Sequence, residues 1–234
     1  MTTFEPRDYD QGMPYRKSPI VTDEIYHIFN RGVAGVPIFS VSKDFLRFLD
    51  LINYYRFKDT PVSFSQFKEI EKGVREEIFN DLVKKNNQHI EILTFCLMDN
   101  HFHFLLKQLA DKGIAKFVGN LQNSYAKYFN IKIERTGPLF NPMFKSVRVT
   151  TDEQLLHVSR YIHLNPSTGY LVEIKDLENY PWSSFSCYLE KCDYSFVDTK
   201  IILGLISKSK YREFVFNQAE YQRRLSDIKH LTFE

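Results

Sequence analysis

The chain has 234 residues, of which 43% are hydrophobic and 26% are charged, the balance of an ordinary globular protein. This composition excludes a wholly disordered chain, a collagen-like repeat and a coiled-coil rod. There are 31 Lys and Arg residues and 29 Asp and Glu residues, giving a net charge of +2. That value excludes a histone-like polycation but leaves room for a local basic surface that binds nucleic acid.

The cysteine content and the hydropathy pattern predict where the protein resides. Three cysteines, a small and odd number, argue against the disulfide framework of a secreted protein. No apolar run approaches the roughly 20 residues that a membrane span needs. The polar N-terminus also lacks the basic-then-apolar order of a signal peptide. We therefore expect a cytoplasmic protein, associated with the nucleoid, that has no membrane partner.

The first part of the chain predicts a strand and a helix after an irregular lead-in over residues 1–23. Residues 24–30 alternate apolar and polar side chains and predict a strand. Apolar residues at helical spacing predict a helix over residues 42–57. The strongly charged residues 58–89 are expected to be an insertion in the core fold, with an exposed helix over 66–85.

The next apolar segments predict a β-hairpin followed by a long helix. Residues 91–98 form a continuous apolar run, and residues 101–107 form a second one. A tight-turn signal at residues 99–100 separates them, which is the pattern of two strands in a hairpin. Apolar residues that recur on one face predict a helix over residues 114–130.

A short strand and one more helix complete the predicted fold. The strand is expected over residues 146–150 and the helix over 152–165, where Pro166 should end it because the residue before proline disfavours the α conformation. This order of elements predicts an α+β fold: a ferredoxin-like antiparallel sheet with helices on one face, an added catalytic helix and a helical C-terminal extension. The core domain is expected over residues 24–166, with residues 167–234 packed on it.

Two histidines on the second strand of the hairpin form the sharpest local feature. Side chains alternate along a strand, so His101 and His103 point to one face while Phe102 and Phe104 point to the other. Two neighbouring imidazoles are suitable ligands for one divalent cation. The same pattern also fits two half-exposed sheet histidines without a ligand, because such a short motif often occurs by chance.

A tyrosine and an asparagine one helical turn apart form the second feature. Tyr161 and Asn165 lie on the same face of the expected helix, so a hydroxyl and an amide oxygen face one point. They also fit a tyrosine at the edge of the core and a helix-capping asparagine. His163 points largely away from that face and is expected to be structural.

Four segments share a pattern when they are taken in order. They are IYHIFNRGVAGVPIF (25–39), CLMDNHFHFLL (96–106), NSYAKYFNIKIERTGPLFNPMFKS (123–146) and SRYIHLNP (159–166). Together they resemble the REP-associated tyrosine transposases of the single-tyrosine HUH transposase superfamily, over about residues 24–190. Four ordered motifs are far more specific than any one of them.

The resemblance implies a nuclease that cuts single-stranded DNA beside a hairpin. It assigns His101 and His103 as metal ligands, Tyr161 as the nucleophile and Asn165 as a third metal-ligand position. Attack by Tyr161 would leave a 5′-phosphotyrosine link and a free 3′-hydroxyl, so strands could be rejoined without ATP. Mg²⁺ or Mn²⁺ is the expected cofactor, because amide and phosphate oxygens favour a harder metal than zinc.

Three departures from the family pattern leave the expected catalytic groups in place. Asp99 stands where the family usually has proline, which should alter only a turn. Met143 stands where it usually has arginine, which should weaken a DNA contact. The charged segment 58–89 has no counterpart in the resemblance.

A basic and aromatic segment predicts the DNA-binding surface. Residues 120–170 hold six basic and three acidic side chains, a net charge of 6 − 3 = +3. Interleaved basic and aromatic residues suit unpaired DNA through phosphate contacts and base stacking, although Tyr125, Phe129 and Phe140 are expected in the core. Single-stranded or hairpin DNA from palindromic repeats is the expected partner. The candidate contacts are Arg31, Lys127, Arg135, Lys145 and Arg148.

Other functions and assemblies stay open on the sequence alone. One alternative is a non-catalytic ferredoxin-like protein that binds nucleic acid. Another is a metal-dependent phosphodiesterase that uses water as its nucleophile. A homodimer is also possible, because the aromatic C-terminal residues could form a dimer surface or simply cover the core; these are Phe185, Tyr188, Tyr194 and Phe196.

Overall fold

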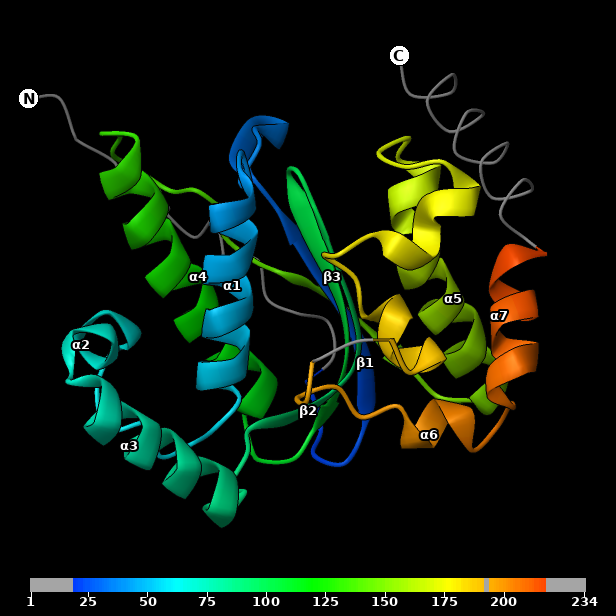
Figure 1. Ribbon diagram of the computed structural model, residues 1–234, viewed down its shortest axis with the longest axis horizontal. Helices are drawn as coiled ribbons and strands as arrows, with labels where there is room; N and C mark the ends of the chain where they lie inside the picture. Colours follow the sequence, from blue (N-terminus) through cyan, green and yellow to red (C-terminus); the bar gives the residue numbers. More distant parts are fainter. Residues whose placement is uncertain (1–18, 192–193, 218–234) are drawn as a thin grey trace, which may run out of the picture.

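A central sheet of four antiparallel strands organises the computed structural model, which describes residues 19–191 and 194–217 (Figure 1). The strands lie in the order β2-β3-β1-β4, and each neighbouring pair is antiparallel. This is the strand order of a ferredoxin-like sheet, so the predicted fold class is confirmed. The bounds are β1 Ile25–Arg31, β2 Ile90–Met98, β3 His101–Gln108 and β4 Lys145–Val149.

Two long helices cover one face of the sheet. They are α1 (Ser42–Tyr55) and α4 (Gly113–Lys132), which pack on each other and receive the buried rings of Phe102 and Phe104. The expected helix over 66–85 is instead two helices, α2 (Phe64–Glu69) and α3 (Lys72–Lys85), because the backbone turns extended at Ile70 with ψ 142°. Figure 1 shows α2 and α3 at the edge of the molecule, beyond α1.

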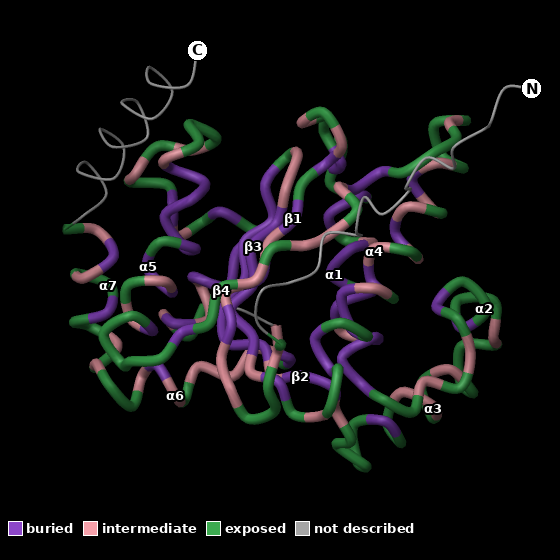
Figure 2. Tube along the Cα trace, turned by 180° about the vertical axis from the view of Figure 1, so that it is seen from behind, coloured by how far each residue is buried: buried purple, intermediate pink, exposed green. Residues whose placement is uncertain are grey.

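The opposite face of the sheet carries α5 (Asp152–Thr168), which packs chiefly on β2 and β3. A second apolar core lies beneath it, so strand residues on both faces are buried (Figure 2). Phe185, Tyr188 and Phe196 are buried, so these aromatic side chains cover the core. The remaining elements are η1 Val33–Gly35, η2 Ile174–Asn179, η3 Ser184–Leu189, α6 Lys200–Leu203 and α7 Lys208–Phe216.

The expected N-terminal lead-in and C-terminal extension lie partly outside the described residues. The irregular lead-in over 1–23 is described only from residue 19, and the C-terminal extension only to residue 217. Within the described part of the chain, none of the helices combines the length and the apolarity needed to cross a membrane.

Helix α5 continues past the proline that was expected to end it. Pro166 lies inside the last turn, and the helix runs on to Thr168. Proline lacks the N–H that would bond to the Ile162 carbonyl four residues earlier. The Asn165 side-chain amide reaches that carbonyl instead, at 3.5 Å. The helix ends at Thr168, within one turn of the proline, and the Asn165 amide takes the place of the missing N–H donor. Pro166 therefore disturbs the helix little.

Candidate active site

The two histidines of β3 lie side by side on the face that carries α5. Their ring centroids are 5.0 Å apart, with the rings nearly perpendicular at 86°. Phe102 and Phe104 point the other way into the core with α1 and α4, as the alternation along the strand predicted. His101 is half-buried, and His103 is only 5% exposed.

A neighbouring asparagine determines the proton position on His101. Asn100 donates from Nδ2 to the Gly35 carbonyl at 3.0 Å, so its Oδ1 faces the imidazole. His101 Nδ1 lies 2.6 Å from that oxygen. An amide oxygen only accepts, so the proton of the neutral imidazole is on Nδ1. The lone pair of His101 is therefore on Nε2, the nitrogen that can bind a cation.

A third histidine, which the sequence analysis did not single out, contacts the pair. His27 on β1 places Nε2 2.9 Å from Nδ1 of His103, and the two rings stack with centroids 5.1 Å apart. Phe29 is the cross-strand partner of His103, and His27 lies two residues away on the same face. Strand alternation alone puts His27 and Phe29 together, but their position beside His103 depends on the pairing of β1 with β3.

Burial keeps all three imidazoles neutral. Desolvation lowers the pKa of His27 to about 4 and that of His101 to about 4, with nearby Arg31 contributing to the latter. The pKa of His103 is lowered well below its usual value by burial and then by the two other imidazoles. Neutral imidazole is the form that binds metal ions.

Tyr161 approaches these rings from α5. Its ring meets His103 edge to face with centroids 5.7 Å apart, and meets His27 in the same way at 5.9 Å. The side chain is nevertheless 42% exposed, so a substrate can reach it. Burial of part of the ring, followed by the proximity of Cys96, raises the pKa of the hydroxyl. The phenol is therefore protonated at neutral pH.

Asn165 lies one helical turn beyond Tyr161 and is buried. Its Nδ2 donates to the Tyr161 carbonyl at 2.9 Å, which orients the side chain along its own helix and leaves Oδ1 as the possible ligand atom. Directly after the last residue of α5, a Cβ added to Gly169 would come within 2.7 Å of Met98, the cross-strand partner of His101. Asn165 thus lies on the stretch of α5 that runs toward the His101 end of the hairpin.

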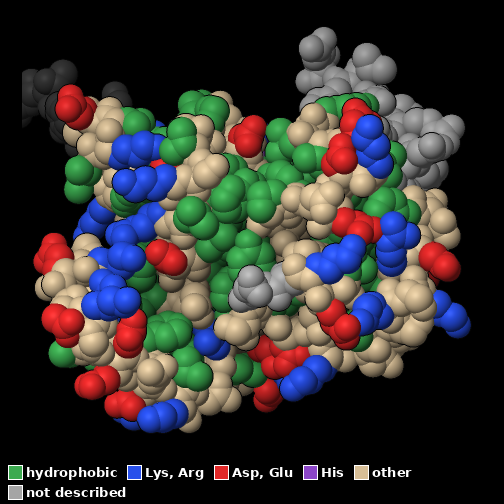
Figure 3. All heavy atoms as spheres, in the orientation of Figure 1, with side chains coloured by type: hydrophobic (Ala, Val, Ile, Leu, Met, Phe, Trp, Pro, Cys, Tyr) green, Lys and Arg blue, Asp and Glu red, His purple; other side chains and the backbone are tan. Residues whose placement is uncertain are grey.

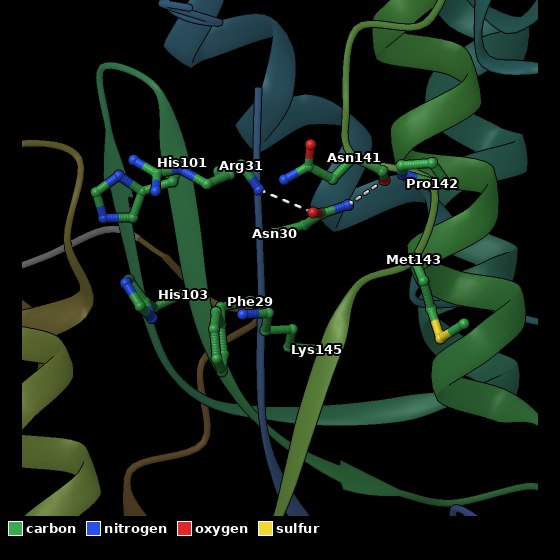
Figure 4. A pocket seen from close by; sticks show the side chains of 9 residues that line it. All are labelled: Phe29, Asn30, Arg31, His101, His103, Asn141, Pro142, Met143 and Lys145. Atoms are coloured by element: carbon green, nitrogen blue, oxygen red, sulfur yellow. Dashed lines mark hydrogen bonds between the residues drawn. The ribbon is translucent and has the colours of Figure 1, made fainter. Parts of the chain in front are cut away.

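A cavity of about 490 Å³ opens beside the histidines (Figure 4). Because α5 covers mainly β2 and β3, the part of this face formed by β1 and β4 is left open to substrate. Arg31 and Lys145 bring positive charge to it, and Lys145 Nζ lies 5.9 Å from the Phe29 ring centroid. The cavity is lined by Phe29, Asn30, Arg31, His101, His103, Asn141, Pro142, Met143 and Lys145.

Asn30 holds the loop that closes one side of this cavity. Its Oδ1 accepts from the Arg31 N–H at 2.9 Å, and its Nδ2 donates to the Asn141 carbonyl at 3.0 Å, as the dashed lines in Figure 4 show. Gly32 permits a further close approach, because a Cβ there would lie 2.4 Å from the Val36 carbonyl oxygen. The Asn-Arg-Gly sequence therefore shapes the cavity and also supplies a cation to it.

The other predicted DNA contacts do not converge on this cavity. Arg148 is paired with Tyr26 of β1, on the opposite face of the sheet from Lys145, and forms an ion pair with Glu24. Arg135 donates to the Pro138 carbonyl at 2.9 Å. Lys127 lies on α4, which packs on the sheet face opposite to the histidines. Figure 3 shows Lys and Arg side chains gathered on the side of the molecule where α4 lies.

Two further basic side chains of the segment 120–170 do not contribute a free positive charge to a DNA-binding surface, because one is ion-paired and the other is buried. Lys132 forms an ion pair with Asp44, and Arg160 is buried against Phe214. The net charge of this segment is thus divided among separate surfaces. Tyr125, Phe129 and Phe140 are buried, as expected.

His163 is fully buried, which agrees with the structural role expected of it. Its two ring nitrogens lie 2.8 Å from the Tyr211 hydroxyl and 2.8 Å from Ser184 Oγ. Tyr211 belongs to α7, and Ser184 Oγ accepts from the backbone N–H of Phe95 on β2. His163 therefore joins α5 to the sheet and to the C-terminal helix, with Tyr161 on the other side of α5.

Residues 64–165 match the family model described as "Transposase IS200 like". The resemblance to single-tyrosine transposases is confirmed for this part of the chain. The transposase match contains both β3 histidines and the α5 residues Tyr161 and Asn165, whereas β1 lies outside it. It also includes α2 and α3, so part of the charged segment expected to be an insertion falls within the family model.

Several solved protein chains are similar to this one. "Structure of the REP associates tyrosine transposase bound to a REP hairpin" is 14% identical to this chain, with a TM-score of 0.47, and the alignment covers 80% of this chain and 97% of that chain. None of the curated proteins matches the chain significantly.

Proposed function

We propose that this protein is a single-stranded DNA endonuclease and strand transferase that acts on hairpin DNA through a phosphotyrosine intermediate. The observation that carries the proposal is the approach of Tyr161 to His103, with ring centroids 5.7 Å apart. The two side chains come from α5 and β3, which are far apart in the sequence. A tyrosine, two neutral imidazoles and a basic cavity together supply the groups that this reaction requires.

The open cavity supports binding of a DNA strand beside the histidines. Arg31 and Lys145 are exposed cations on its walls and are suited to phosphate oxygens. The ring of Phe29 between them offers an apolar surface to an unpaired base. Because the β1 and β4 side is open, a strand could lie along the sheet with one phosphate between Tyr161 and the imidazoles.

The donor set fits a divalent cation. His101 and His103 are neutral and adjacent, and the Oδ1 of Asn165 would be the third ligand. Among residues 19–191 and 194–217, no group of three or more His, Cys, Asp or Glu side chains is placed to hold a metal. Such a site therefore relies on amide and phosphate oxygens, which favours Mg²⁺ or Mn²⁺. A bound cation would polarise the phosphate and orient it for displacement.

The chain's own residues account for the rest of the chemistry. Tyrosine is a weak nucleophile because its pKa is about 10, and burial raises the pKa of Tyr161 further. Placement beside the phosphate offsets this weakness, as in other covalent catalysis. The Tyr161 oxygen loses its proton and bonds to phosphorus, while the bond to the 3′ oxygen breaks and that oxygen gains a proton. Attack by another 3′-hydroxyl reverses the step and joins strands.

A denaturing gel with a labelled hairpin oligonucleotide and Mn²⁺ tests this proposal. The oligonucleotide carries a single-stranded flank and is labelled on the 3′ side of the expected cut, so that the covalently held fragment is visible. We expect a band of protein mass that carries the label and disappears after proteolysis. Free cleavage products without this band would indicate a phosphodiesterase that uses water. Intact DNA that binds the protein tightly would indicate a non-catalytic binding protein.

A further inference from the structure

The third histidine at this site, His27, contacts one of the proposed metal ligands directly. Its Nε2 lies 2.9 Å from Nδ1 of His103, and the rings are stacked with an interplanar angle of 24°. Its ring also meets the Tyr161 ring edge to face. His27 lies on β1, outside the residues that match the transposase family. The match therefore assigns it no role.

His27 could be a third metal ligand or a hydrogen-bond partner of the ligand His103, and the geometry distinguishes these two roles. A third ligand would direct a ring nitrogen at the same point as His101 and His103. Across the described residues, no cluster of three or more His, Cys, Asp or Glu side chains is placed to hold a metal. Nε2 of His27 is instead bonded to His103. His27 is therefore positioned as a hydrogen-bond partner of a ligand.

The role of this bond follows from the tautomers of neutral imidazole. An imidazole that gives its Nε2 lone pair to a cation carries its proton on Nδ1. His103 would then donate from Nδ1 to Nε2 of His27, just as His101 donates from Nδ1 to Asn100. Metal-binding histidines usually have such an acceptor, which determines the tautomer and the ring orientation.

We propose that His27 is a positioning residue that holds His103 in the tautomer whose Nε2 binds the divalent cation. This inference rests on the proposed function. His27 replaces the carboxylate or carbonyl oxygen that commonly accepts this hydrogen bond. The two ligands are thus oriented by different elements, His103 by β1 and His101 by the turn between β2 and β3.

The test is Mn²⁺ affinity measured by calorimetry or by electron paramagnetic resonance on the full chain. His27→Phe keeps an aromatic ring but removes the acceptor, and should weaken Mn²⁺ binding about 10- to 100-fold. His27→Gln can place an amide oxygen near the position of Nε2, and should recover part of the lost affinity. His157→Phe changes a half-exposed histidine elsewhere on α5 and should leave the affinity unchanged. Circular dichroism checks the folding of each variant.

Activity adds a second readout of the same effect. Formation of the covalent adduct by His27→Phe should recover when the Mn²⁺ concentration is raised by the factor lost in affinity. Equal Mn²⁺ affinities in the wild type and a folded His27→Phe would overturn the role proposed for His27 and would leave the proposed metal chemistry intact. If His27→Phe does not fold, His27→Gln is compared with His101→Ala, because replacing a positioning residue should cost less Mn²⁺ affinity than removing a ligand. A lower Mn²⁺ affinity of His27→Gln than of His101→Ala would contradict the positioning role. A wild-type protein that binds no Mn²⁺ would overturn the proposed metal chemistry together with this inference.

Discussion

The rings of His103 and Tyr161 meet edge to face, with centroids 5.7 Å apart, although one lies on β3 and the other on α5. The histidine is held by the sheet and by His27, while the helix is held by its buried face against β2 and β3. The relative position of the two side chains therefore depends on how α5 packs on the sheet. That packing includes the buried bonds of His163, on the opposite side of the helix.

The first prediction concerns the Tyr161 hydroxyl. Tyr161→Phe removes one oxygen atom and keeps the ring that packs against His103, so folding and hairpin binding should persist. Strand cleavage and the covalent adduct should both disappear, because no other group replaces the nucleophile. A denaturing gel measures both products. Cleavage by the Phe variant without an adduct would show that water is the nucleophile.

The second prediction concerns metal dependence. His101→Ala removes one imidazole from a half-buried position and should reduce cleavage at least about 100-fold, since a catalytic metal supplies several kcal/mol of transition-state stabilisation. Hairpin affinity in the presence of chelator should be nearly that of the wild type. Chelator should abolish wild-type cleavage, and added Mn²⁺ should restore it. Wild-type cleavage that continues in excess chelator would contradict the metal role.

The third prediction separates two basic residues of the same strand. Lys145 lines the cavity, whereas Arg148 points to the other face and is paired with Glu24. Lys145→Ala should weaken hairpin binding and reduce the slope of log affinity against log salt concentration by about one, because one phosphate contact is lost. Arg148→Ala is the matched control and should leave the slope unchanged. Fluorescence anisotropy over a salt series measures both, and the opposite result would place the DNA on the α4 face.

Local periodicity predicted the parts of the site that lie within one element. His101 and His103 share a face because strand side chains alternate, and Tyr161 and Asn165 share a face because they are one helical turn apart. The alternation of β4 also places Lys145 and Arg148, three residues apart, on opposite faces. The two side chains therefore do not form one DNA-binding surface.

Other parts of the site depend on contacts between elements. His27 lies beside His103 only through the pairing of β1 with β3, which no motif in either strand specifies. The continuation of α5 through Pro166 is a local exception to the preference of the backbone before proline, and it is accompanied by a 3.5 Å contact from Asn165 Nδ2 to the Ile162 carbonyl within the same helix. Individual charges such as Arg148 are neutralised by partners distant in the sequence.

The last prediction concerns the ion pair that joins the two helices on the other face of the sheet. Asp44 at the start of α1 is fully buried, and both of its carboxylate oxygens lie 2.7 Å from Lys132 Nζ at the end of α4. Burial by itself would raise the pKa of this carboxyl, but hydrogen bonds from Lys132, the Ser40 N–H and Tyr128 together lower it below 3.8. The folded state therefore binds this proton more weakly than the unfolded state does. The resulting stability is present above about pH 4 and is lost as the pH falls through the folded-state pKa.

Asp44→Asn should accordingly lower the free energy of unfolding at pH 7 by about 2–3 kcal/mol, the range expected for hydrogen bonds to a charged group. The difference from the wild type should shrink as the pH falls below about 4, because the carboxyl of the unfolded state then takes up its proton and the advantage of the folded state is lost. Asp50→Asn is the matched control on the same helix; its contact with Lys68 is 3.8 Å long and exposed, so its effect should stay below about 1 kcal/mol. Urea unfolding followed by the fluorescence of Trp182, the single tryptophan, measures all three proteins at both pH values. A difference between Asp44→Asn and the wild type that is unchanged from pH 7 to pH 3 would show that the lost stability does not depend on the charge of Asp44, because the titrations that the two proteins share cancel in the difference.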